Sequence, residues 1–291
     1  CGSGASQQEI KIDGSGTVYP ITEAVAEEFR KVDTDNRVSV GSSGSGAGFR
    51  KFTRGETDIS NSSRKISEEE IALAEENGIE YQQFAIALDG ISIVVHPDND
   101  WVKSLTPEEL NKIWKADSEV QQWSDIREGW PDEDIRLYGP NTAHGTYDFF
   151  TEVINGESGA SRTDYNAVAD YNVAVQGISS DKYSLGYFGL AYYEENADQL
   201  KLVGINAGEG AVEPSLETVK NGTYKPLSRS LYIYVAKSAA ERPAVQKFVE
   251  FYFDNAGELA QDVGYVPMPA EDIQEQKSAF QSFASDTVAA N

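Results

Sequence analysis

The stretch Gly14-Ser15-Gly16-Thr17-Val18-Tyr19-Pro20 decides the fold, because it joins a strand to a helix. Ile10-Lys11-Ile12, which precedes this stretch, has the pattern of a short strand. Pro20, at the end of the stretch, suits the first turn of a helix. Ile21, Val25 and Phe29 follow at helical spacing, which places them on one face. A strand, a glycine-rich turn and a helix in this order indicate an α/β protein.

Two further stretches repeat this design: a turn rich in glycine and hydroxyl residues that opens a helix. They are Gly41-Ser42-Ser43-Gly44-Ser45-Gly46-Ala47-Gly48 and Thr142-Ala143-His144-Gly145-Thr146. The first turn of a helix leaves backbone N–H groups unpaired and carries partial positive charge. Such turns bind tetrahedral oxyanions without needing net charge. The residues singled out on this ground are Gly16, Ser43 and Gly46.

The remaining elements alternate strand and helix, which favours mostly parallel sheets. Val38-Ser39-Val40 is a second expected strand. Ser67 with Glu70, and Thr106 with Glu109, are capping boxes that begin helices. Two separate helices are expected near the C-terminus, around 245–253 and 257–263.

Two strands mark the expected lobe junctions, Ile91-Ser92-Ile93-Val94-Val95 and Leu231-Tyr232-Ile233-Tyr234-Val235. We place the hinge near their N-terminal ends. Residues 9–90 and 231–291 then form lobe I, and 91–230 form lobe II. Residues 1–8 form a tether.

The composition is strongly acidic: 48 acidic and 24 basic residues give a formal net charge of −24. This argues against nucleic acid and anionic membrane surfaces as partners. Such a surface also repels a small anion at long range, and in ~1 M salt the Debye length falls to ~3 Å and screens that repulsion. The composition therefore predicts a salt-loving (halophilic) protein, with an ordinary acidic protein as the alternative.

The motifs of common enzyme classes are absent from the sequence. There is no P-loop, no G-x-S-x-G elbow and no H-E-x-x-H. With two histidines, His96 and His144, and one cysteine, a Cys/His metal site is not expected. We predict a binding protein with no cofactor, no metal and no catalytic residues.

The cysteine is Cys1, followed by the small and polar run Gly2-Ser3-Gly4-Ala5-Ser6-Gln7-Gln8. This pattern is typical of a mature lipoprotein, whose first cysteine carries lipid and whose next residues form a flexible tether. It predicts a protein in the periplasm or at the cell surface, attached to the membrane only through an N-terminal lipid anchor. No apolar run reaches the ~18 residues of a membrane span.

Several motifs, in order along nearly the whole chain, resemble one family. They are Asp13-Gly14-Ser15-Gly16-Thr17-Val18-Tyr19-Pro20-Ile21-Thr22-Glu23-Ala24, Gly48-Phe49-Arg50-Lys51-Phe52, Arg54-Gly55-Glu56-Thr57-Asp58-Ile59-Ser60, Gly145-Thr146-Tyr147-Asp148-Phe149-Phe150, Arg162-Thr163-Asp164-Tyr165, Val175-Gln176-Gly177 and Leu185-Gly186-Tyr187-Phe188-Gly189. They resemble the phosphate-binding subunits of bacterial high-affinity phosphate ABC transporters, and most closely the lipoprotein branch.

The resemblance implies a two-lobed periplasmic-binding-protein fold (type II) with the ligand in the cleft between the lobes. It implies capture of inorganic phosphate and its delivery to the membrane permease of an ABC transporter. Closure on the ligand would be a hinge motion near 90 and 230.

The resemblance also assigns ligand residues by position. Thr17 offers a hydroxyl and Val18 a backbone N–H. The second-loop serine corresponds to Ser45, and the third loop to Gly145 and Thr146. The remaining assigned positions are Ser63, Arg64 and, as a weaker candidate that is equally consistent with a structural ion pair, Arg162.

Three positions depart from the better-known branch of the family, which has Asp, Arg and Ser where this chain has Ser63, Pro140 and His144. A buried carboxylate accepts the proton that phosphate carries and repels sulfate, so another acceptor must discriminate here. Arg64 is the first choice for the missing cation, since guanidinium binds phosphate bidentately. Neutral His144 can accept the phosphate proton, and its cation can add charge. The alternative is a side chain that points into solvent.

Other functions stay open at this point. The same fold can bind sulfate, molybdate or a phosphonate. A secreted phosphatase that uses Ser or Thr with His144 is a second alternative, and a phosphate sensor or scaffold is a third.

Overall fold

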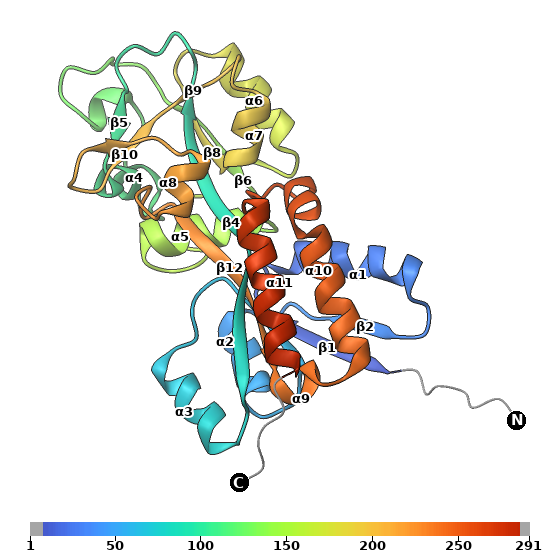
Figure 1. The fold of residues 1–291 in the computed structure, drawn as a ribbon. Coiled ribbons are helices and arrows are strands. Elements are labelled where there is room, and N and C mark those ends of the chain that lie inside the picture. Colours follow the sequence, from blue (N-terminus) through green and yellow to red (C-terminus); the bar gives the residue numbers. More distant parts are fainter. Residues whose placement is uncertain (1–7, 286–291) are drawn as a thin grey trace, which may run out of the picture. The chain divides into compact units, whose positions relative to one another are not determined.

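The computed structural model describes residues 8–285. Residues 1–7 of the predicted tether, which include Cys1, lie outside the described residues. The helices are α1 (Tyr19–Val32), α2 (Ser45–Phe52), α3 (Glu68–Glu76), α4 (Pro107–Trp114), the 3₁₀ turn η1 (Trp123–Asp125), α5 (Gly145–Asn155), α6 (Tyr171–Ser180), α7 (Leu190–Glu195), α8 (Leu216–Lys220), α9 (Lys237–Ala240), α10 (Pro243–Asp262) and α11 (Ala270–Ser285). Strands lie between them (Figure 1), so the expected α/β class is confirmed.

The strands are β1 (Glu9–Gly14), β2 (Arg37–Val40), β3 (Ile59–Ser62), β4 (Tyr81–Val95), β5 (Ser104–Leu105), β6 (Arg136–Pro140), β7 (Asn166–Val168), β8 (Ser184–Gly189), β9 (Lys201–Leu202), β10 (Gly204–Asn206), β11 (Ala211–Val212) and β12 (Ser228–Ala236). The chain forms two compact units. Unit 1 comprises the residues up to Leu88 and those from Ser230 onward, and unit 2 is Asp89–Arg229. The chain passes from one unit to the other within β4 and again within β12. The sequence placed these boundaries at 90/91 and 230/231.

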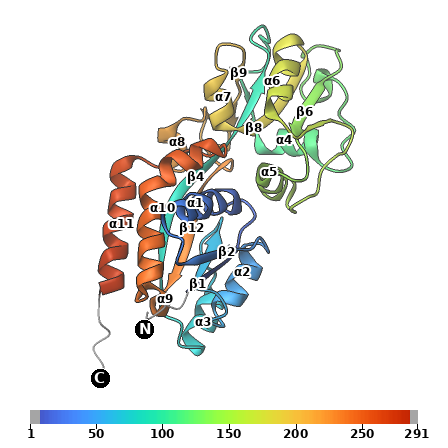
Figure 2. The ribbon, with the colours of Figure 1, turned by 90° about the vertical axis from the view of Figure 1, so that its right-hand side faces the viewer.

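The sheet of unit 1 has the strand order β2-β1-β3-β12, with β4 next to β12. Strands β2 and β3 are parallel to β1, whereas β12 is antiparallel to β3. Helix α1 buries Ile21, Val25 and Phe29, the face that the spacing predicted. Phe29 packs edge-on against Phe248 of α10, with ring centroids 5.3 Å apart. Such contacts place α1 and α10 side by side over the sheet (Figure 2).

The C-terminal region differs from the expectation. The two helices expected at 245–253 and 257–263 are one continuous helix, α10, so that prediction was wrong. Buried Ala256 and Ala260 continue the apolar face across Gly257, and their burial outweighs the ~1 kcal/mol that glycine costs inside a helix. Helix α11, which the sequence analysis did not identify, packs beside α10 (Figure 1) and buries Phe280 against Phe84 and Phe253.

The main sheet of unit 2 places β6 between two parallel neighbours, β7 and β8, and β8 pairs with β4. Strand β9 pairs with the end of β4, and β11, β10 and β5 form a separate three-stranded sheet. Aromatic packing fills the interior. The Phe150 and Tyr187 rings stack with centroids 3.8 Å apart, and Trp114 meets Tyr187 edge-on at 4.9 Å. Helix α5, which carries Phe150, is thereby fixed against the sheet.

Both expected capping boxes are present. Ser67 and Glu70 exchange hydrogen bonds at the start of α3, and Thr106 and Glu109 do so at the start of α4. Among the described residues, no helix is long and apolar enough to cross a membrane.

Candidate functional site

Three loops of unit 1 meet where the sheet order reverses. The chain leaves β1 for β2 on one side and reaches β3 on the other, so the switch point lies between β1 and β3. In parallel α/β sheets, ligands bind outside the carboxyl ends of the strands at such a point. Three segments lie at these carboxyl ends: residues 14–18 at the end of β1, residues 41–44 after β2 and residues 61–64 at the end of β3.

Backbone hydrogen bonds join the three loops. Ser15 N–H donates to the Asn61 carbonyl at 2.9 Å, and Gly44 N–H donates to the Gly14 carbonyl at 2.8 Å. Gly48 lies so close that a Cβ there would be 2.5 Å from the Gly14 Cα. The glycines of the motif therefore serve close backbone packing as well as the turn.

Asp13, at the end of β1, joins the first two loops through its carboxylate. It accepts hydrogen bonds from Gly14 N–H at 2.7 Å, from Ser43 N–H at 3.1 Å and from Ser43 Oγ at 2.8 Å, and it pairs with Lys51 of α2. Burial by itself would raise the pKa of Asp13, but the bonds from Lys51, Ser43 and Gly14 outweigh it and lower the pKa. Ser43, predicted as a ligand residue, has its hydroxyl bound to Asp13 and supports the loop instead.

Asp13→Asn is therefore expected to destabilise the protein by about 1–3 kcal/mol at neutral pH, since charge-assisted bonds from Lys51 and Ser43 are lost. The pKa of Asp13 is lower in the folded state, so its stabilisation is present above the unfolded value near ~3.9 and is lost as pH falls through the folded value. Urea unfolding of both proteins between pH 7 and pH 3 checks this, and the difference between their free energies of unfolding should narrow toward the acidic end. A gap that is constant with pH would contradict the assignment.

The first-loop amides converge on one oxygen. Thr17 N–H and Val18 N–H both donate to Ser15 Oγ, at 3.1 and 3.3 Å, and Ser15 is 2% exposed. An anion that takes the predicted bond from Val18 must therefore share or replace Ser15 as acceptor. Gly16 lies beside the second loop, where its Cβ would be 3.2 Å from Ser42 Oγ.

Ser45 and Ser63 are neighbours in the structure, as the resemblance implies for two residues of one site. Their hydroxyl oxygens are 3.2 Å apart, and Ser63 N–H donates to Ser45 Oγ at 3.1 Å. Ser45 begins α2, so its hydroxyl lies at the first turn of that helix. The pair contributes hydroxyl groups, and neither residue supplies the carboxylate of the better-known branch.

Arg64 lies beside the same loop. Its Nη2 is 3.6 Å from the position of a Cβ on Gly46, and its guanidinium forks onto Glu70 at 2.7 and 2.9 Å. Burial would raise the pKa of Glu70, but the bonds from Arg64 and Ser67 outweigh it, so Glu70 is held as a carboxylate. Arg64 is placed to contact an anion at Gly46, in competition with Glu70.

The third loop lies in unit 2, between β6 and α5. Gly145 and Thr146 are the first two residues of α5, and His144 is its N-cap residue without a side-chain cap. His144 Nε2 is 3.0 Å from the Ala169 carbonyl, and its ring lies 4.8 Å from that of Tyr171. A carbonyl oxygen only accepts, so Nε2 carries a proton and Nδ1 is the acceptor of the neutral ring. His144 is thus held by the protein, in contrast to the alternative of a solvent-directed side chain.

Arg162 does not face a loop of the candidate site. Its side chain is 4% exposed, and Nη1 donates to the carbonyls of Ile113 and Val120 at 3.0 and 2.9 Å. Nε and Nη2 form a fork with Asp164 at 2.7 and 2.9 Å. The structure therefore favours the alternative interpretation, a structural ion pair, over a phosphate-facing arginine.

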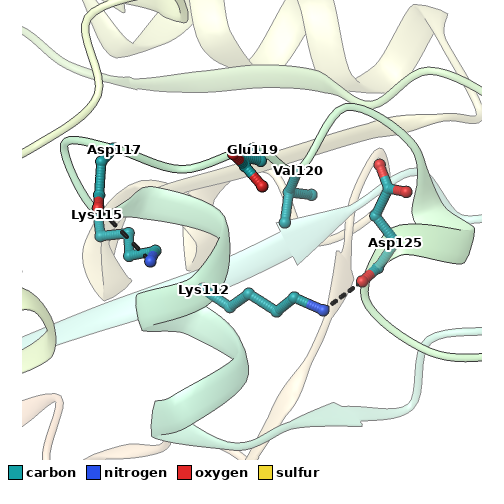
Figure 3. Close-up of a pocket in the computed structure, with 6 residues that line it drawn as sticks. All are labelled: Lys112, Lys115, Asp117, Glu119, Val120 and Asp125. Atoms are coloured by element: carbon teal, nitrogen blue, oxygen red, sulfur yellow. Dashed lines mark hydrogen bonds and ion pairs between the residues drawn. The ribbon is translucent and has the colours of Figure 1, made fainter.

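A polar cavity of about 490 Å³ lies elsewhere in unit 2 (Figure 3). Its lining residues are Lys112, Lys115, Asp117, Glu119, Val120 and Asp125. Both lysines are engaged, Lys112 with the Asp125 carbonyl at 2.5 Å and Lys115 with the Asp117 carboxylate at 3.5 Å. None of the predicted ligand residues lines it. Within residues 8–285, no cluster of three or more His, Cys, Asp or Glu side chains is arranged to hold a metal ion.

The fold and the loops at the switch point of the unit 1 sheet define a class of binding protein, and sequence comparison agrees. The family model described as a PBP superfamily domain matches residues 2–256. The chain therefore belongs to the PBP superfamily.

Individual relatives place the chain more closely. It is 45% identical over 291 residues to "Protein SphX" of Synechocystis, covering 99% of this chain and 87% of that protein. It is 42% identical over 278 residues to "Phosphate-binding protein PstS" of Staphylococcus saprophyticus, covering 95% and 85% of the two chains. The crystal structure of a possible phosphate binding protein from Planctomyces limnophilus superposes with a TM-score of 0.92 at 44% identity, covering 97% of this chain and 100% of that one. The resemblance to phosphate-binding subunits is confirmed.

Proposed function

We propose that the protein binds inorganic phosphate with high affinity and delivers it to the permease of an ABC transporter. The observation that carries the proposal is the meeting of three loops of the unit 1 sheet at its switch point, two of which open the helices α1 and α2, in a chain 42% identical to a phosphate-binding protein. The proposed ligand residues in unit 1 are Gly16, Thr17, Val18, Ser45, Gly46, Ser63 and Arg64. In unit 2 they are His144, Gly145 and Thr146.

Calorimetric titration of phosphate-stripped protein with phosphate and then sulfate, at low and high salt, tests the proposal. We expect 1:1 phosphate binding and no heat from sulfate. Sulfate binding would indicate another oxyanion, and binding of neither would contradict the proposal. Turnover of a chromogenic phosphate ester would favour the alternative of a secreted phosphatase.

His144 is proposed to take part in discrimination, since Ser63 replaces the usual carboxylate. Its bond to the Ala169 carbonyl leaves Nδ1 as the acceptor for a phosphate proton. His144→Ser is expected to weaken phosphate binding about tenfold, the effect of one hydrogen bond to a charged ligand, and to change its pH slope between pH 5 and 9. Titrations across that range check this. Unchanged affinity and slope would remove His144 from the site.

We further propose that the protein works outside the cytoplasmic membrane, in the periplasm or at the cell surface, tethered by a lipid on Cys1. The N-terminal sequence pattern supports this. Mass spectrometry of the protein purified from its native membranes would detect the lipid as added mass on the N-terminal peptide.

The acidic composition supports adaptation to salt. With a formal net charge of −24, self-repulsion destabilises the fold when it is not screened. We expect the melting temperature to fall on desalting from ~1 M to ~0.05 M salt, by more than the change that a matching concentration of uncharged sucrose produces. A melting temperature indifferent to salt would contradict halophilic adaptation.

A further inference from the structure

Arg229 and Asp89 form a buried ion pair within unit 2. Asp89 is the first residue of this unit and Arg229 its last. The Asp89 side chain is 2% exposed and that of Arg229 is 16% exposed, and Arg229 Nε lies 3.3 Å from Asp89 Oδ2. Burial raises the pKa of Asp89, and the charge and hydrogen bond of Arg229 act against that rise. Asp89 thus fixes one edge of the guanidinium.

The face of the same guanidinium lies on helix α5. Arg229 Cζ is 3.7 Å from the centroid of the Phe149 ring, so the cation stacks on the aromatic face. Phe149 is three residues after Thr146, and residues at that spacing share a helix face. The field of Arg229 also reaches Asp148 in the first turns of α5, where it counteracts the rise of that pKa caused by burial.

A buried hydroxyl marks the same place independently. Tyr171 is 5% exposed, and its hydroxyl has no hydrogen-bond partner of normal geometry in the described structure. Burial raises its pKa, while the neighbouring Thr146 lowers it and the charge of Asp89 raises it. The phenol is therefore a protonated donor, and its ring lies 4.8 Å from that of His144, the N-cap residue of α5. An unpaired buried donor beside a helix N-terminus indicates an anion-binding site.

The other arginines of unit 2 do not fit this role. Arg162 is engaged by interior carbonyls and Asp164. Arg136 is 65% exposed and pairs with Asp181 at 3.7 Å. Arg127 forks onto Glu109 and stacks on Trp130 at 4.8 Å, with its side chain 41% exposed.

We propose that Arg229 is the cation that binds the anion at the N-terminus of α5, with Asp89 and Phe149 fixing its orientation. It takes the place of the arginine that the chain lacks at Pro140. The inference rests on phosphate as the ligand of this site. A planar guanidinium so held retains little rotational freedom to lose on binding, and a charged donor in a low-dielectric setting discriminates strongly for a dianion.

Phosphate titration of four proteins tests this: the wild type, Arg229→Lys, the double variant Asp89→Asn/Arg229→Met, and Arg127→Met. The double variant removes both charges and leaves no unpaired buried carboxylate. We expect its Kd to rise by about 10- to 150-fold, the range for a lost charge-assisted hydrogen bond. Arg229→Lys should bind phosphate about fivefold more weakly than the wild type, because an ammonium group cannot donate two parallel hydrogen bonds or stack on Phe149 as a guanidinium does. Arg127→Met is the matched control, an arginine between a carboxylate and an indole, and should stay within about twofold of the wild type.

The pH profile separates a ligand contact from a merely structural role. The charge of Arg229 acts more strongly on the phosphate dianion than on the monoanion. Between pH 6 and 8, the gain in affinity seen for the wild type should therefore flatten in the double variant.

Wild-type affinity and slope in the folded double variant would overturn the role of Arg229 and leave phosphate binding standing. If the double variant does not fold, the affinity of Arg229→Lys decides, and wild-type binding there overturns the proposal. Absence of phosphate binding by the wild type would overturn the proposed function together with this inference.

Discussion

Gly14→Ala is expected to destabilise the protein by about 3–5 kcal/mol and to abolish phosphate binding. Two effects add. Gly14 has φ of +140°, a conformation that L side chains rarely adopt and that costs about 1–3 kcal/mol, and its new methyl group would overlap the Asn61 carbonyl oxygen. Because Ser15 N–H donates to that same carbonyl, the shift would separate the first loop from β3. Chemical unfolding gives the free energy, and calorimetry gives the binding.

Gly78→Ala is the matched control. Gly78 also has a positive φ, +66°, but a Cβ there would meet nothing within 4 Å. Its cost should be about 1 kcal/mol, from backbone strain alone, with phosphate affinity unchanged. If the two variants lost equal stability, the close approach of Gly14 to Asn61 would be unimportant.

Arg162→Met should destabilise unit 2 by about 3 kcal/mol and leave the phosphate affinity of the folded protein within about threefold of the wild type. Two buried carbonyls, of Ile113 and Val120, would lose their charged donor, and an unpaired buried acceptor costs about 1–3 kcal/mol. Asp164 is 61% exposed and can be solvated once its partner is gone. Urea unfolding and titration at a temperature where the variant is folded measure the two effects.

Arg136→Met provides the comparison, since that side chain is 65% exposed and its partner Asp181 is at 3.7 Å. Its stability should stay within about 0.5 kcal/mol of the wild type. A large loss of phosphate affinity in Arg162→Met with no loss of stability would restore Arg162 as a ligand residue.

Local sequence patterns predicted the elements that depend on local physics. The face of α1 with Ile21, Val25 and Phe29, and the capping boxes of α3 and α4, needed only spacing and side-chain chemistry. The three helix-opening loops were predicted for the same reason, because the same glycine- and hydroxyl-rich pattern recurs three times before a helix.

Local patterns could not predict contacts between residues that lie far apart in the sequence. Asp13 belongs to a recognised motif, but its role depends on Ser43 and Lys51, which are 30 and 38 residues away. Arg229 and Asp89 are 140 residues apart, and only the fold brings them together. A serine that accepts from two amides of its own loop, as Ser15 does, could have been suspected from its position ahead of the helix.

The helix boundary at Gly257 was mispredicted for a related reason. Glycine lowers local helix propensity, and the sequence alone does not show how much apolar surface the next turn buries. Within α10 the packed face runs from Ala244 to Ala260, so tertiary packing overrides the local break.

The position of β12 has a consequence for how the protein folds during its synthesis. This strand lies between β3 and β4 in the sheet of unit 1, yet it follows the whole of unit 2 along the chain. A nascent polypeptide that ends before Ser228 already contains β5–β11 but lacks the strand that lies between β3 and β4 in the first sheet. Because the sheet of unit 1 lacks this strand until then, we expect its N-terminal part to complete its fold only after Ser228–Ala236 has left the ribosome.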